Sequence, residues 1–111
     1  MIFPDDENGD VLRRMAVSDF PFSKFHDVDF FALFARNEDA AFVAKQFIAD
    51  HEAGNPLVAV KTVPHEAGRT ELRIVKSMLV THESVTAFEN LLADRCARFD
   101  SQLDGWGVMQ D

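Results

Sequence analysis

The most informative stretch of the sequence is Asp104-Gly105-Trp106-Gly107-Val108-Met109, which follows the last predicted helix. It is the one place where a rare residue, a turn signal and a strand signal coincide. Trp106 is the sole tryptophan, and Asp104-Gly105 is typical of a turn because glycine adopts positive φ without a Cβ clash. The stretch therefore predicts a final strand, from about Trp106 to Met109, that returns to a sheet.

A second stretch, residues 28–35 (VDFFALFA), is the strongest strand signal upstream. Successive side chains of a strand point to opposite faces of the sheet. Here both faces are apolar, with Phe30 and Phe34 on one and Phe31 and Leu33 on the other. The pattern predicts a central strand that is at least partly covered on both sides.

The remaining elements follow from helical spacing and from glycine and proline breakers. The expected ranges are a short helix over 11–16 capped by Asp10, a helix from Asn37 to about His51, strands over 57–63 and 70–80 with a hairpin loop over 64–68, and a helix from His82 to about Asp100. The long helices have apolar inner stripes made of Ala40, Val43, Ala44, Phe47 and Ile48, and of Val85, Phe88, Leu92, Cys96 and Phe99.

The resulting order, a helix followed by βαββαβ, predicts an α+β ferredoxin-like sandwich with an extra short N-terminal helix. We expect the third strand beside the first at the centre of the sheet, and the fourth strand on the other side of the first. Both long helices would cover one face and leave the other open. A single domain over residues 1–111 is expected, with residues 1–9 as a flexible acidic lead.

Composition narrows the class of partner. The chain has 111 residues and a net charge of −8, so general binding to nucleic acid is disfavoured and a basic protein surface is favoured. The single cysteine, Cys96, can form no internal disulfide. The N-terminus lacks the features of a signal peptide, and no apolar run approaches the ~20 residues of a membrane span. We therefore expect a cytoplasmic protein.

No pattern predicts catalysis, a cofactor or a metal site. The four histidines lie on separate elements without zinc spacing, and Cys96 lies on a helix's inner stripe, as a buried inert thiol would. The run Asp5-Asp6-Glu7 lacks the ligand periodicity of a calcium loop and is typical of a solvated segment.

Two features of the sequence are each compatible with two interpretations. Residues 57–81 carry four basic and two acidic side chains, a net charge of +2, which suits either a solvated edge hairpin or a contact for an acidic partner or RNA. Trp106 suits either a structural role or a share in binding a partner.

The motif Asp104-Gly105-Trp106-Gly107, after a helix ending Arg98-Phe99-Asp100, resembles the regulator of ribonuclease activity B (RraB) family. The strand beginning Val28-Asp29-Phe30-Phe31 is also similar to that family's first core strand, and the order of elements agrees from about Asp10 to Met109. The resemblance implies a ferredoxin-like bacterial protein that inhibits ribonuclease E by binding it. The scaffold region of that enzyme is rich in basic segments.

The main hypothesis is thus a non-enzymatic regulator that binds ribonuclease E and alters RNA processing and decay. Its expected contact residues are Asp5, Asp6, Glu7, Asp104 and Trp106. The open sheet face leaves room for a homo-oligomer. The alternative is a small-ligand-binding or sensor domain of the same fold without a ribonuclease partner. A third hypothesis is a small enzyme, against which the lack of an adjacent nucleophile and base, or of a metal pattern, argues.

Overall fold

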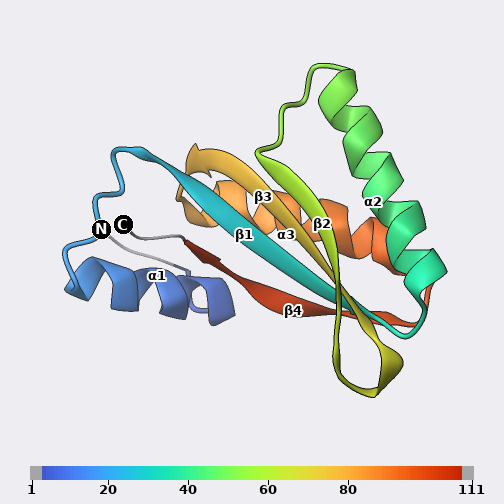
Figure 1. Ribbon diagram of the computed structural model, residues 1–111. Coiled ribbons are helices and arrows are strands. Elements are labelled where there is room, and N and C mark those ends of the chain that lie inside the picture. The colour runs from blue at the N-terminus through green and yellow to red at the C-terminus, as the bar shows by residue number, and fades with distance from the viewer. Residues whose placement is uncertain (1–3, 109–111) are drawn as a thin grey trace.

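The structure, a computed structural model, describes residues 4–108 and combines three helices with a four-stranded antiparallel sheet. The elements in chain order are α1 (Glu7–Val17), β1 (Phe25–Phe34), α2 (Asn37–Glu52), β2 (Ala59–Pro64), the 3-10 turn η1 (Glu66–Gly68), β3 (Thr70–Leu79), α3 (His82–Cys96) and β4 (Ser101–Val108). Figure 1 shows how the three α-helices and four strands are arranged. The predicted α+β class and the extra N-terminal helix are confirmed.

The strand order is β2-β3-β1-β4, as the sequence predicts. β1 pairs with β3 along its whole length, from Phe25 opposite Leu79 to Phe34 opposite Thr70. β4 lies on the other side of β1, and β2 is the outer neighbour of β3. β1 therefore occupies the centre of the sheet.

The core lies between one face of this sheet and the helices. Phe30 and Phe34 of β1 are fully buried, and the Phe30 ring lies 4.5 Å from that of Phe88 on α3. Burying a side chain of this size contributes roughly 1.5–3 kcal/mol. α2 adds Phe47, and α1 adds Leu12, which is also fully buried. The N-terminal helix thus belongs to the same core as the two long helices.

On the other face of the sheet, the apolar side chains at the centre are also largely buried. Leu33 and Val75 are only 5% and 6% exposed there. The guanidinium of Arg73 lies 5.2 Å from the centre of the Phe31 ring. At one end of this face, Phe25 of β1 is 69% exposed. The prediction that β1 is partly covered on both faces is therefore confirmed.

Two helix boundaries and one inner-stripe residue differ from the sequence prediction. α1 begins at Glu7, so that residues 7–9, expected in a flexible lead, form its first turn, and Asp6 rather than Asp10 is the N-cap. α3 ends at Cys96, before Phe99, which still packs on the core 6.2 Å from the Phe34 ring. Ile48 was wrongly placed on the inner stripe of α2, because it is 43% exposed.

The largest difference concerns β4, which begins at Ser101 rather than near Trp106. Asp104-Gly105 is not a turn before the strand but lies inside it. The pairing register with β1 shifts between Phe30 and Ala32, and Gly105 has a φ of +93° at this irregularity. The positive φ that the sequence pattern assigned to a turn is thus used for a bulge. Met109, the predicted end of the strand, lies outside the described residues.

Candidate functional site

α1, α3 and β4 enclose a cleft of about 500 Å³. It brings together three of the predicted contact residues, Asp6, Glu7 and Trp106. The other lining residues are Asn8, Val11, Thr86, Glu89, Asn90, Leu103 and Gly105. Because its walls come from both ends of the chain, the cleft exists only when the N-terminal helix is docked.

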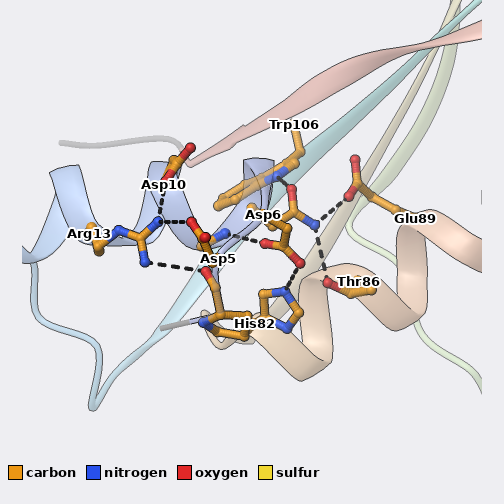
Figure 2. A network of polar contacts seen from close by, with 11 residues as sticks. Asp5, Asp6, Asp10, Arg13, His82, Thr86, Glu89 and Trp106 are labelled. Atoms are coloured by element: carbon orange, nitrogen blue, oxygen red, sulfur yellow. Dashed lines mark hydrogen bonds and ion pairs between the residues drawn. The ribbon is translucent and has the colours of Figure 1, made fainter. Parts of the chain in front are cut away.

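Trp106 forms one wall of the cleft. It lies opposite Phe30 in the β1–β4 pairing, so its side chain is on the core face of the sheet, and the half-buried ring packs against the core. Its indole Nε1–H donates a hydrogen bond of 2.9 Å to Oδ1 of Asn8. Figure 2 shows the indole lying against the start of α1. The residue has a structural role and also borders the cleft.

Asn8 joins the three elements of the cleft. Its Oδ1 accepts from Trp106 on β4, and its Nδ2 donates to two side chains of α3. These acceptors are Thr86 Oγ1 at 3.1 Å and Glu89 Oε1 at 2.7 Å. A single primary amide can bridge the elements in this way because it carries both donors and an acceptor.

Asp6 fixes the start of α1. Its carboxylate accepts a hydrogen bond of 2.7 Å from the backbone N–H of Gly9 and lies 2.8 Å from Nε2 of His82, the first residue of α3. The Gly9 hydrogen bond first, and the His82 contact second, hold the pKa of Asp6 below its usual value. Gly9 is required here because a Cβ would lie 1.7 Å from the carbonyl oxygen of Pro4.

The structure separates Asp5 and Asp104 from the cleft lining. Asp5 is exposed and forms an ion pair of 3.8 Å with Arg13, which also contacts Asp10 (Figure 2). Asp104 is exposed on β4 beside the bulge glycine. These two carboxylates add negative charge to the surface of α1 and β4.

Sequence reasoning missed Asn8, Thr86, Glu89 and His82. Asn8 lies in a segment that was expected to be a solvated lead, so nothing local marks it as a bridge. Thr86 and Glu89 are three residues apart and share a helix face, which is a weak signal common on helix surfaces. Only their contacts with the other end of the chain distinguish them.

The cleft is suited to binding. Asp6, Glu7 and Glu89 supply carboxylates beside an indole ring, whereas the one thiol in the chain, Cys96, is buried elsewhere. Burial raises the pKa of Cys96 to about 11, so the thiol is a poor nucleophile near neutral pH.

Within residues 4–108, no group of three or more His, Cys, Asp or Glu side chains could hold a metal ion. No helix in the same range is long and apolar enough to cross a membrane.

Comparison with known proteins identifies one family. A search of curated proteins returns no match. The family model for regulator of ribonuclease activity B (RraB) matches residues 5–108, a range that contains every residue lining the cleft. Regulation of ribonuclease activity, rather than catalysis, defines this family. The chain therefore belongs to the regulator of ribonuclease activity B family.

Proposed function

We propose that this protein binds ribonuclease E in the cytoplasm and modulates RNA processing and decay without catalysing a reaction. The observation that carries the proposal is the cleft between α1, α3 and β4, where an indole lies among carboxylates in a chain from a family of ribonuclease regulators. Occupying the enzyme's scaffold would change which RNAs are processed.

The chemistry of the cleft favours a basic segment of the partner. Asp6, Glu7 and Glu89 can accept hydrogen bonds from lysine or arginine, and charge-assisted pairs are stronger than neutral ones. The face of Trp106 can stack on a guanidinium or ammonium group. The net charge of −8 would also steer a cationic surface toward the protein.

The proposal is tested with purified ribonuclease E, by measuring binding and cleavage of a substrate RNA with and without this protein. We expect saturable binding and altered cleavage. Glu7→Gln removes an exposed cleft carboxylate and should weaken binding about two- to fivefold. Glu52→Gln, which alters the exposed last residue of α2, is the matched control and should bind like the wild type. Absence of binding by the wild type would refute ribonuclease E as the partner.

Self-association through the open sheet face is a separate proposal. Phe25 lies opposite Leu79 on this face, and the two side chains are 69% and 36% exposed. Together they form an apolar end at which a second copy could pack. Sedimentation of the wild type and of Phe25→Ser over a range of concentrations tests this. A wild-type protein that stays monomeric throughout would contradict it.

A further inference from the structure

A second pocket, of about 300 Å³, lies between α2 and α3 and shares no residue with the cleft. Its lining residues are Phe47, Asp50, Asn55, Leu57, Lys76, Phe88, Leu91 and Arg95. Lys76 is the unusual member, since it lies on the helix-covered face of β3, in line with Ile74 and Met78. A cation is thereby placed beside the apolar core.

The inner walls of the pocket are apolar. Phe47 and Phe88 are 1% and 8% exposed, and their ring centres lie 5.7 Å apart. Leu57 and Leu91 complete the apolar lining, and Leu91 is 38% exposed. Phe47 is the closed base of the pocket, whereas Leu57, Phe88 and Leu91 can take an aliphatic or aromatic group of a ligand out of water.

The polar groups of the pocket favour an anion. Lys76 Nζ donates a hydrogen bond of 3.3 Å to the carbonyl oxygen of Pro56, which leaves donors available on the ammonium group. Arg95 Nη1 lies 2.6 Å from a carboxylate oxygen of Asp50, and its guanidinium carbon is 4.4 Å from the centre of the Phe47 ring. Two cations against one carboxylate give the pocket a positive balance in a chain of net charge −8.

We propose that this pocket binds a small organic carboxylate with an apolar body. The carboxylate would lie at Lys76, with Arg95 adding positive potential. The body would pack on Leu57, Phe88 and Leu91. The volume is at the lower end of the ~300–1,000 Å³ usual for small-molecule sites, so the ligand is small. The site is independent of the proposed contact with ribonuclease E, because the two share no residue.

The test uses the full chain without any ribonuclease and 3-phenylpropionate as the probe. Binding is followed by NMR amide shifts and by calorimetry. The neutral amide of the same acid is the matched ligand. We expect saturable binding of the acid with shifts at the pocket, and about tenfold weaker binding of the amide, because a charge-assisted hydrogen bond is lost. Equal binding of acid and amide, or no saturable binding, would overturn the proposal.

Two variants locate the binding. Lys76→Gln should reduce the affinity for the acid about tenfold, whereas Lys61→Gln, at an exposed position on β2, should leave it unchanged. Leu91→Glu places a like charge at a rim position and should also weaken binding of the acid while a folded core is retained. It gives a result even where Lys76→Gln unfolds the protein. Wild-type affinity in folded Lys76→Gln or Leu91→Glu would show that the acid binds elsewhere.

Discussion

Trp106 connects the core to the cleft, and its two contributions can be separated by substitution. Trp106→Phe keeps aromatic packing but removes the hydrogen bond to Asn8, which should lower the free energy of unfolding by about 1 kcal/mol. Trp106→Ala also removes the packing and should cost about 2–4 kcal/mol, because the ring is half-buried. Urea unfolding followed by circular dichroism measures both. If the two variants are as stable as the wild type, neither the packing of the ring nor its hydrogen bond contributes to the free energy of unfolding.

Cys96 should be almost unreactive in the native protein. The side chain is 3% exposed, and burial raises its pKa to about 11, so the thiol stays protonated at pH 8. Only the thiolate attacks disulfide reagents. We expect slow reaction with an aromatic disulfide reagent at pH 8 and rapid reaction after unfolding in urea. Equal rates in the two states would mean that the end of α3 opens readily.

Residue-level prediction from the sequence succeeded where a side chain's role is local. The buried Cys96 was predicted from its place on a helical stripe, and this is confirmed. Asp5, Asp6 and Glu7 could not be told apart, because a run of acids near a terminus carries no local pattern. Their different roles come from Arg13, from His82 and from the cleft, which are contacts that form only in the folded chain.

At the scale of elements, the start of α1 shows why local capping signals are ambiguous. Asp6 and Asp10 are both good N-cap residues, and the apolar spacing favoured Asp10. Asp6 is the actual cap because Gly9 fits against the Pro4 carbonyl and Asn8 bonds to α3 and β4. These tertiary contacts extend the helix by four residues beyond the sequence prediction.

The anchoring of α1 should weaken in acid. The pKa of Asp6 is lower in the folded than in the unfolded state, so its contribution to stability is present above the ordinary value of 3.8. That contribution is lost as the pH falls through the lowered value. The protection factor of the Gly9 amide, which is the exchange rate of an unstructured peptide at the same pH divided by that of the amide, should therefore fall below about pH 4. Asp6→Asn retains a capping side chain without this titration, and its Gly9 amide should lack that step. An identical acid profile in both proteins would exclude Asp6 as the cause.

β4 contains two glycines, one at the bulge and one outside it, and substituting each tests the cost of the bulge. Gly105 has a φ of +93°, which side chains rarely adopt, whereas Gly107 does not have a positive φ, and a Cβ there would meet no atom within 4 Å. Gly105→Ala should destabilise the protein by about 1–2 kcal/mol. Gly107→Ala should change stability by less than about 0.5 kcal/mol. Thermal unfolding of the two variants decides this, and equal melting temperatures would show that the bulge relaxes without cost.

At the scale of the whole molecule, the topology was predictable from one strand. The apolar residues on both faces of residues 28–35 require a central position, and the βαββαβ order then fixes the neighbours of β1. The cleft was not predictable, because it depends on the angle at which α1 docks against α3 and β4. No spacing within the sequence relates Asn8 to Thr86, Glu89 and Trp106.

Binding to a basic partner should separate into a salt-sensitive and a salt-insensitive part. The electrostatic screening length falls from ~10 Å at 0.1 M to ~3 Å at 1 M salt. The contribution of the net charge of −8 to the affinity for a basic partner should therefore decrease over that range. Glu7→Gln should weaken binding at low salt and have little effect at high salt. Trp106→Phe keeps an aromatic ring and changes no charge. We therefore expect its affinity to depend on salt as that of the wild type does. Isothermal titrations of ribonuclease E at both salt concentrations measure these differences. If wild-type affinity is the same at 0.1 M and 1 M salt, apolar contacts carry the complex, and the carboxylates of the cleft do not.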